Sequence, residues 1–408
     1  MAGRPRLKPL HKQTMVITGA TSGIGLATAR AAARRGARVF LIARGGDDLR
    51  ALSEEIQAAG GRAAYAVCDV ADEAALNEAA DRCRRLFGGI DTWVNNAGAS
   101  IYGPIRETTL EDHKRLFDTN YWGVVNGSLV AVEQLRAQGG GALINVGSVL
   151  SDAPIPVQGL YSASKHAVKG FTNALRMELM REKAGISVTL VKPSAIDTPY
   201  NEHARNLTGE PFRNPPPVYA ASVVADVIVH CAENPIREIT VGGGGRVIAG
   251  FHHLIPGLAE PLFARFGPAM MRNPRGEMPE HDGLWDPTED GLYEEVDDYP
   301  HVRTYSLLAQ ARMHPRLVIG AVGLGVAAAV LLVLLNRPRR SRADRMTEVS
   351  RRQAQALGEL LAGAGRKGRR VLREVRDEGR ETAAGWAAGL TALIAAMAGA
   401  IDRRNRRG

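Results

Sequence analysis

Short, continuously apolar runs alternate with longer helix-type stretches from residue 14 to about residue 242. Seven runs show this pattern: TMVIT, RVFLIA, AAYAV, IDTWVN, ALINVG, SVTLVK and EITVG. Continuous hydrophobicity is typical of a parallel strand buried on both faces, because crossover helices cover each side of the sheet. The pattern therefore predicts an α/β fold with a doubly wound, parallel, seven-stranded sheet.

A glycine-rich turn, TGATSGIG, directly follows the first apolar run and opens the next helix-type stretch. Glycines let the backbone turn tightly and approach a pyrophosphate, whose charge meets the free amides and the positive end of the helix. Its place between the first strand and the first helix makes the turn a strong indication of a dinucleotide site. The residues of this turn expected at the cofactor are Gly19, Ser22, Gly23, Ile24 and Gly25.

The end of the second run favours one form of the cofactor. The run ends in Ala43 and Arg44, where many NAD-binding sites present a carboxylate to the ribose hydroxyls. A missing acid and a guanidinium favour the 2′-phosphate of NADP, so NADP(H) is predicted in preference to NAD(H). A solvated charge at the end of a strand is the alternative interpretation of Arg44.

The pentapeptide YSASK places Tyr161 and Lys165 one helical turn apart. Such a pair often lies on a solvated helix face. In the catalytic interpretation, a carbonyl that receives a hydride also needs a proton, and Tyr161 donates that proton. The Lys165 ammonium then stabilises the phenolate that remains. Because the pentapeptide follows a phosphate-binding turn in the same chain, the catalytic interpretation of Tyr161 and Lys165 is favoured.

The order of these motifs resembles that of the short-chain dehydrogenase/reductase family, from residue 14 to about residue 242. The matching segments are TGATSGIG, CDV at 68–70, NNAG at 95–98, DTNYWG at 118–123, NVGS at 145–148 and YSASK. The resemblance implies a Rossmann-fold oxidoreductase that interconverts a carbonyl and an alcohol.

The resemblance also implies roles for individual residues. Tyr161 corresponds to the proton donor, and Lys165 to the partner that lowers its pKa and holds the nicotinamide ribose. Ser148 corresponds to the hydroxyl that orients the carbonyl, and it is preferred to Ser151 because it directly follows a strand. Asn120 corresponds to the support of a water-linked proton path, with helix capping as the alternative. Along the cofactor the resemblance places Asp69 at the adenine, together with Val70, Asn96, Ala97, Gly98, Tyr161, Lys165, Pro193 and Thr198.

The chain departs from the family pattern after the sixth strand. The segment KPSAIDTP has Ser194 where the family usually has glycine, which leaves the backbone path of this loop open. The flanking loops carry an apolar set of side chains: Val149, Leu150, Ile155, Pro156, Tyr200 and Phe212. These loops predict a small hydrophobic ketone, aldehyde or alcohol as substrate, in contrast to a charged acid.

Composition divides the 408-residue chain into five parts. A basic arm at 1–13 precedes the catalytic domain at 14–250, and an acidic, turn-rich region at 251–316 is expected to be an irregular extension or linker. The nineteen uncharged residues at 317–335 predict a transmembrane helix. A basic helical tail follows at 336–408, in which 385–401 could be a second span, an interfacial helix or a helix packed against protein.

Location and partners are inferred from these parts. The cofactor is cytosolic, so the catalytic domain is expected to face the cytoplasm while the chain is anchored to membrane lipid. The arginines after residue 336 run against the positive-inside tendency and leave the topology of the tail open. The resemblance implies a homo-oligomer, a dimer or tetramer, with helices at about 105–138 and 157–183 as contact faces.

Other function classes are less consistent with the sequence. Much of the net charge of +9 lies after residue 336, so a nucleic-acid partner of the main domain has little support. Three widely spaced cysteines predict neither a zinc site nor a disulfide framework. A catalytically silent NADPH-binding membrane scaffold or sensor is the alternative function, but such a protein would have no need of the proton donor Tyr161.

Overall fold

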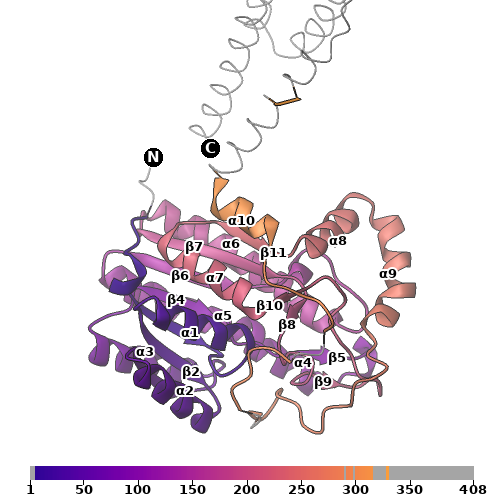
Figure 1. Cartoon of the computed structure of the whole chain (residues 1–408), viewed down its shortest axis with the longest axis horizontal. Helices are drawn as coiled ribbons and strands as arrows, with labels where there is room; N and C mark the ends of the chain where they lie inside the picture. The colour runs from indigo at the N-terminus through magenta and orange to yellow at the C-terminus, as the bar shows by residue number, and fades with distance from the viewer. Residues whose placement is uncertain (1–4, 289–290, 297–298, 316–327, 330–408) are drawn as a thin grey trace, which may run out of the picture. The chain divides into compact units, whose positions relative to one another are not determined.

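Seven parallel strands form the central sheet, in the order β11-β7-β6-β4-β1-β2-β3 (Figure 1). The computed structural model describes residues 5–288, 291–296, 299–315 and 328–329. The strands are β1 (Thr14–Thr18), β2 (Arg38–Ala43), β3 (Arg62–Val67), β4 (Thr92–Asn95), β6 (Gly141–Val146), β7 (Ile186–Pro193) and β11 (Glu238–Val241). Each of the seven predicted runs matches one of these strands to within two residues, which confirms the predicted seven-stranded parallel α/β sheet.

Helices cover both faces of this sheet. One hydrophobic core lies under α1 (Gly23–Arg34), α2 (Gly46–Ala58) and α7 (Ala221–Glu233). A second core lies under α3 (Glu73–Phe87), α5 (Gly123–Ala137) and α6 (Gly159–Arg181) on the opposite face. Because the strands are buried on both sides, their side chains are apolar without alternation, as the sequence shows.

The strand order reverses between β1 and β4, which pair in parallel from Met15 and Thr92 onward. Strands β2 and β3 follow β1 on one side, whereas β4, β6, β7 and β11 follow on the other side. Ligands of open α/β sheets bind in the crevice at the carboxyl ends of the strands around such a point.

Smaller elements surround this edge of the sheet. They are α4 (Leu110–Phe117) and the paired segments β5 (Ile101–Tyr102) with β9 (Arg205–Asn206), and β8 (Ile196–Asp197) with β10 (Val218–Ala220) and β12 (Val302–Arg303).

The region after β11 is partly helical, although residues 251–316 were expected to be irregular. It contains α8 (Gly243–Leu254), α9 (Pro256–Met271) and α10 (Leu307–Met313). Between α9 and α10 the described chain is mostly extended and turned, and it packs on the domain with Leu284 fully buried. The described part of the region therefore packs on the catalytic domain as an extension.

The predicted membrane segment at 317–335 lies outside the described residues except at 328–329, and the tail at 336–408 lies outside them entirely. Within the described parts of the chain, no helix is both long and apolar enough to cross a bilayer.

Candidate active site

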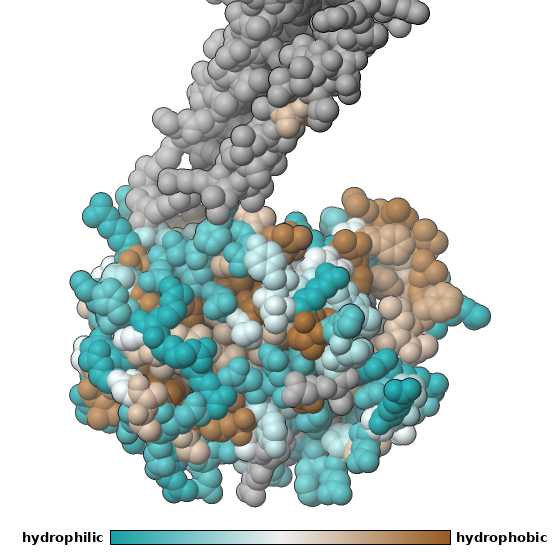
Figure 2. Space-filling view, viewed as in Figure 1, coloured by the Kyte–Doolittle hydropathy of each residue, from teal (hydrophilic) through white to brown (hydrophobic). Residues whose placement is uncertain are grey.

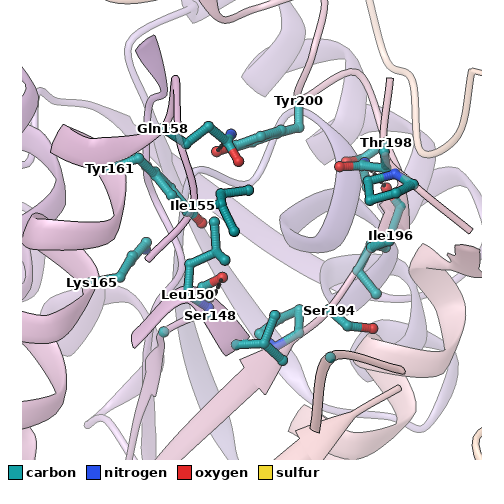
Figure 3. A pocket seen from close by; sticks show the side chains of 18 of the residues that line it. Ser148, Leu150, Ile155, Gln158, Tyr161, Lys165, Ser194, Ile196, Thr198 and Tyr200 are labelled. Atoms are coloured by element: carbon teal, nitrogen blue, oxygen red, sulfur yellow. Dashed lines mark hydrogen bonds between the residues drawn. The ribbon is translucent and has the colours of Figure 1, made fainter. Parts of the chain in front are cut away.

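A cavity of about 650 Å³ opens at the carboxyl edge of the sheet (Figure 3). Its lining includes residues that directly follow four central strands: Gly19 after β1, Asn96 after β4, Gly147 after β6 and Ser194 after β7. A volume of this size lies within the range of small-molecule sites. The cavity joins the glycine-rich turn at one end to Tyr161 and Lys165 at the other.

Tyr161 and Lys165 both lie on α6, one turn apart, as the pentapeptide predicts. The Lys165 side chain is buried, and its Nζ donates a hydrogen bond of 3.0 Å to the carbonyl oxygen of Val146 at the end of β6. The same Nζ lies 5.6 Å from the centre of the Tyr161 ring. Burial lowers the pKa of Lys165 from 10.5 to about 8, so the ammonium form persists at neutral pH.

The Tyr161 hydroxyl has two polar neighbours. Burial raises the pKa of Tyr161, while hydrogen bonds with Ser148 and Tyr200 act in the opposite direction. Tyr200 packs its ring against Tyr161 with 5.5 Å between the ring centres. The Tyr200 hydroxyl donates to Ser100 Oγ at 2.7 Å and accepts from Gln158 Nε2 at 3.1 Å. Tyr200 therefore adds a polar group to the site, although the sequence suggested only an apolar wall residue there.

Ser148 lies where β6 ends and a short helical turn begins. Its Oγ accepts a hydrogen bond of 3.1 Å from the Leu150 amide, and its own amide donates to Ser151 Oγ at 3.2 Å. Ser148 lines the cavity, and Ser151 holds the turn on which Ser148 sits. This geometry agrees with the choice of Ser148 over Ser151.

Asn120 is fully buried in a π-helical turn, Asp118–Trp122, of the kind that often marks a functional site. Its side chain accepts from the Ala99 amide at 2.8 Å and donates to the Ala99 carbonyl at 2.9 Å. Its Nδ2 also donates to Ser164 Oγ on α6 at 3.1 Å. Asn120 thus ties the loop after β4 to the catalytic helix, while its role in a proton path stays a prediction.

The glycine-rich turn packs so closely on neighbouring backbone that Gly19 and Gly25 have no room for a side chain. A Cβ on Gly25 would lie 1.8 Å from the Gly19 carbonyl oxygen, and a Cβ on Gly19 would lie 2.8 Å from Ala97 Cα. Asn96 Nδ2 donates to the carbonyl of Gly19 at 3.0 Å, which holds the turn after β4 against the turn after β1. Together with the first amides of α1, these residues fit the pyrophosphate of a dinucleotide.

The fold accommodates Ser194, which replaces the glycine that the family usually has in this loop. A Cβ on Gly242 would lie 1.8 Å from Ser194 Oγ, so the serine side chain occupies space that this glycine leaves. Gly242 has φ of +103°, which favours glycine at this position. Pro193 and Thr198 both line the cavity, and Thr198 lies against Gly23.

The remaining walls of the cavity are mainly apolar. Val149, Leu150, Ile155 and Tyr200 line it as predicted from the loops. Phe212 stacks instead on Tyr102, with 5.0 Å between ring centres, and Pro156 lies beside Gly267 of α9. Additional lining comes from α8 and α9, which no sequence motif indicated: Val247, Ile248, Phe263, Met270 and Met271.

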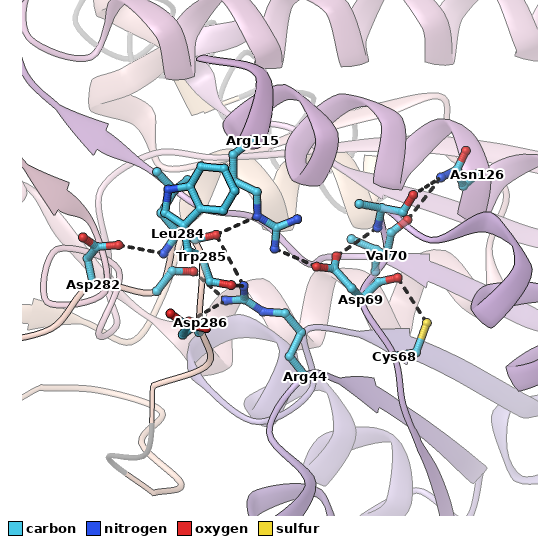
Figure 4. A network of polar contacts seen from close by, with 12 residues as sticks. Arg44, Cys68, Asp69, Val70, Arg115, Asn126, Asp282, Leu284, Trp285 and Asp286 are labelled. Atoms are coloured by element: carbon cyan, nitrogen blue, oxygen red, sulfur yellow. Dashed lines mark hydrogen bonds and ion pairs between the residues drawn. The ribbon is translucent and has the colours of Figure 1, made fainter. Parts of the chain in front are cut away.

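The residues expected at the adenosine end are engaged with protein groups (Figure 4). Asp69 Oδ2 pairs with the Arg115 guanidinium at 2.6 Å. Burial alone would raise the pKa of Asp69, but the Ala71 amide and Arg115 hold it below its usual range. Val70 is buried beside Asp69, and its carbonyl accepts from Asn126 Nδ2 at 3.3 Å. Arg115 is a residue of this site that no sequence motif indicated.

Arg44 donates hydrogen bonds to four main-chain carbonyls of the extension. The acceptors are Gly283 at 2.5 Å, Trp285 at 2.8 Å, Asp286 at 3.1 Å and Leu284 at 3.4 Å. Arg44 is therefore not a free solvated charge, and it lies in one network of polar contacts with Asp69 and Arg115, to which it is linked through the Leu284 carbonyl (Figure 4).

Comparison with known proteins agrees with this geometry. A family model described as short chain dehydrogenase matches residues 13–208. The chain is 39% identical over 329 residues to "Uncharacterized oxidoreductase YxnA" of Bacillus subtilis, which covers 79% of this chain and 91% of that protein. It is 34% identical over 209 residues to "Dehydrogenase/reductase SDR family member 7B" of Bos taurus, covering 50% and 64%. It is 36% identical over 189 residues to "Putative ketoacyl reductase" of Streptomyces coelicolor, covering 46% and 72%.

This chain belongs to the short-chain dehydrogenase/reductase family. It is an oxidoreductase of the class that acts on CH–OH and C=O groups with a nicotinamide dinucleotide.

Proposed function

We propose that this protein is an NADP(H)-dependent oxidoreductase that interconverts a carbonyl and an alcohol on an apolar substrate. One observation carries the proposal: Ser148, Tyr161 and Lys165 line one end of an apolar cavity whose other end is the glycine-rich turn. A substrate in the apolar part would then place its carbonyl between the proton donor and the nicotinamide.

A nicotinamide dinucleotide held by the glycine-rich turn and Lys165 would supply the hydride for reduction of the carbonyl. Ser148 Oγ orients the carbonyl oxygen, and the Tyr161 hydroxyl donates its proton to the oxygen as negative charge develops there. The Lys165 ammonium stabilises the phenolate that remains. In oxidation the same tyrosine oxygen accepts the proton of the alcohol.

The preference for NADP(H) is supported by the end of β2. Arg44 lies there with Arg115 nearby, and both guanidinium groups suit a phosphate. A 2′-phosphate in this region would be met by positive charge, whereas an NAD site would need a carboxylate for the ribose.

The substrate class is supported by the walls of the cavity. Aliphatic and aromatic side chains from the loops and from α8 and α9 line it, with few fixed charges. A lipid-derived, isoprenoid or steroid-like carbonyl fits these walls. The name of the Streptomyces coelicolor relative makes ketoacyl compounds a further class to test.

A membrane location is supported by a surface next to the cavity. Large apolar side chains gather on α8 and α9 (Figure 2), on the helices that also line the cavity. The exposed members are Val247, Ile248, Leu254, Ile255, Leu258, Leu262, Phe266 and Met270. Together with the uncharged segment 317–335, this surface supports anchoring to a membrane. The catalytic domain would face the cytoplasm, where the cofactor is found.

A homo-oligomer is supported by exposed apolar side chains on the helices that the resemblance indicated. They are Leu110 on α4, Trp122 before α5, Leu129 on α5, and Met177 and Met180 on α6. Side chains of this size are common in subunit contacts.

The test uses the full chain in detergent and in lipid nanodiscs. NADPH oxidation is followed with apolar ketones, aldehydes and ketoacyl esters, beside the Tyr161→Phe variant. Turnover that is lost in the variant and is slower with NADH supports the proposal. Tight NADPH binding without turnover in either environment favours the silent scaffold or sensor.

A further inference from the structure

A strap from the extension contacts two groups that are expected to bind the cofactor, the Arg44 side chain and the Gly23 amide. We define the strap as residues 283–288 and 291–296, which lie far along the chain from the glycine-rich turn. Its first part covers Arg44, whose guanidinium donates to the carbonyls of Gly283, Leu284, Trp285 and Asp286. All four acceptors are main-chain oxygens, so this contact depends on the backbone conformation of the strap and not on its side chains.

The second part of the strap reaches the glycine-rich turn itself. The amide of Gly23, the first residue of α1, donates a hydrogen bond of 2.7 Å to the Tyr293 carbonyl oxygen. Next to it, Glu294 forms an ion pair of 2.9 Å with Arg30 on α1. The first amides of a helix after such a turn are the groups that meet a pyrophosphate.

Side chains hold the strap in this position. Leu284 is fully buried in an apolar cluster with Ile101 and Leu116. The Trp285 indole donates to Asp112 Oδ1 at 3.0 Å and lies under the Arg115 guanidinium, 5.8 Å from the ring centre. The Glu295 carboxylate accepts from the Ala221 amide at 3.1 Å.

The strap and a dinucleotide would therefore use the same donors. Arg44 is the residue expected at the 2′-phosphate, and the Gly23 amide belongs to the turn expected at the pyrophosphate. Both hold carbonyl oxygens of one segment. The strap also carries the carboxylates of Asp286, Glu294 and Glu295, which would repel phosphates placed beside them.

We propose that the strap is a built-in competitor of the cofactor, whose carbonyls occupy the phosphate donors until NADP(H) displaces them. The inference rests on the proposed NADP(H) site. Only the fraction of molecules with the strap released binds the cofactor, so the apparent Kd is the intrinsic Kd divided by that fraction. Changes that weaken the strap without touching the phosphate donors then tighten binding.

Hydrogen exchange of the full chain tests the displacement directly. Peptides that cover the strap are measured with and without saturating NADP⁺, and binding is verified separately by calorimetry. Faster exchange of the Leu284–Asp286 and Tyr293–Glu295 amides on binding supports the competitor. Slower exchange would show that the strap clamps the cofactor, and unchanged exchange would show that the two do not share donors; either result overturns the inference.

Two strap variants test the same inference through affinity, independently of turnover. Trp285→Ala removes the hydrogen bond to Asp112 and the ring contact with Arg115, Glu294→Gln removes the ion pair with Arg30, and both variants leave Arg44 and Gly23 in place. Because one net hydrogen bond is lost, the apparent Kd for NADP⁺ is expected to fall by about fivefold. Weaker or equal binding in both variants would overturn the competitor.

The matched control is Glu182→Gln, which breaks the surface ion pair between Arg136 on α5 and Glu182 after α6. It removes a carboxylate from an arginine, as Glu294→Gln does, and its affinity for NADP⁺ should equal that of the wild type. If neither the wild type nor the strap variants bind NADP⁺, the cofactor assignment fails together with the inference. If all bind and turnover is absent, only the proposed reaction fails.

Discussion

Lys165 Nζ lies 5.6 Å from the centre of the Tyr161 ring and gives its hydrogen bond to Val146. The lysine is thus fixed at the end of β6, one turn along α6 from the tyrosine, and not placed on the tyrosine oxygen itself. From this position its charge acts on the phenolate through a buried environment, in which electrostatic interactions are stronger than in water.

Tyr161→Phe removes the proton donor and keeps the ring. We expect kcat for NADPH-dependent reduction to fall by about 10²- to 10⁴-fold, because general acid catalysis contributes about that much. The Kd for NADPH should change little. Steady-state kinetics and fluorescence titration measure the two quantities.

The control for this variant is Tyr305→Phe, which changes an exposed tyrosine in the same way. Wild-type turnover in that control would show that the loss is specific to position 161. Retention of more than a tenth of wild-type kcat in Tyr161→Phe would contradict the assigned role.

The pH dependence of reduction should report Lys165. Its pKa is lowered to about 8 by burial, so the side chain is charged below that pH and neutral above it. Loss of the ammonium removes the stabilisation of the phenolate, and kcat/KM for reduction is therefore expected to decline above about pH 8. A profile that stays level up to pH 10 would be inconsistent with this role.

The same lowered pKa predicts a dependence of stability on pH. Because the folded state holds the lysine proton less tightly than the unfolded state, the charged form costs stability below about pH 8, and this cost disappears as the pH rises to 10.5. The full effect amounts to about 3–4 kcal/mol. Urea unfolding at pH 8 and at pH 10.5 measures the gain, which should be absent in Lys165→Met.

Much of the fold and the central site could be predicted from sequence because the two depend on one pattern. Strands buried on both faces must be continuously apolar, as SVTLVK is in β7, and residues that follow such strands must meet at one edge. Gly19, Asn96 and Ser148 therefore line one cavity at that edge, and Ser194, whose loop path the sequence left open, lines it with them.

The extension could not be predicted in the same way. Helix α9 contains Pro261 and Pro268, and prolines inside a segment argue against a helix. The contacts of the strap with Arg44 and Gly23 use main-chain carbonyls, which every residue has. No side-chain pattern marks such contacts, so only the three-dimensional path of the chain reveals them.

Tyr200→Phe tests the polar role that the sequence did not indicate. The Tyr200 hydroxyl is bonded to Ser100 and Gln158, and its hydrogen bond with Tyr161 lowers the pKa of Tyr161. Without that bond, the pKa of Tyr161 rises, so the pH at which the rate of alcohol oxidation increases should move upward. Tyr102→Phe is the control, since the hydroxyl of Tyr102 donates to Asn201; an equal shift in both variants would argue against a specific role.

Gly25→Ala should disrupt the phosphate turn. A Cβ there would lie 1.8 Å from the Gly19 carbonyl oxygen, so the turn has to move and NADPH binding is expected to weaken by at least about tenfold. Gly170→Ala is the control, because nothing lies within 4 Å of the added carbon on α6. That variant should bind normally and gain about 0.5–1 kcal/mol in the free energy of unfolding. Normal NADPH affinity in Gly25→Ala would refute the placement of the cofactor on this turn.

Arg44→Ser tests whether the Arg44 guanidinium serves the 2′-phosphate of the cofactor or the carbonyls of the strap. A charge-assisted hydrogen bond contributes about 1.5–3 kcal/mol, so kcat/KM with NADPH should fall by about 10- to 100-fold when the 2′-phosphate loses its donor. NADH has no 2′-phosphate and therefore loses no contact in this variant. Because the strap also loses its contact with position 44, kcat/KM with NADH should stay equal or rise. The ratio of the two kcat/KM values, measured beside the exposed-arginine control Arg50→Ser, reports the change in selectivity. An unchanged ratio would show that Arg44 serves the strap and not the cofactor.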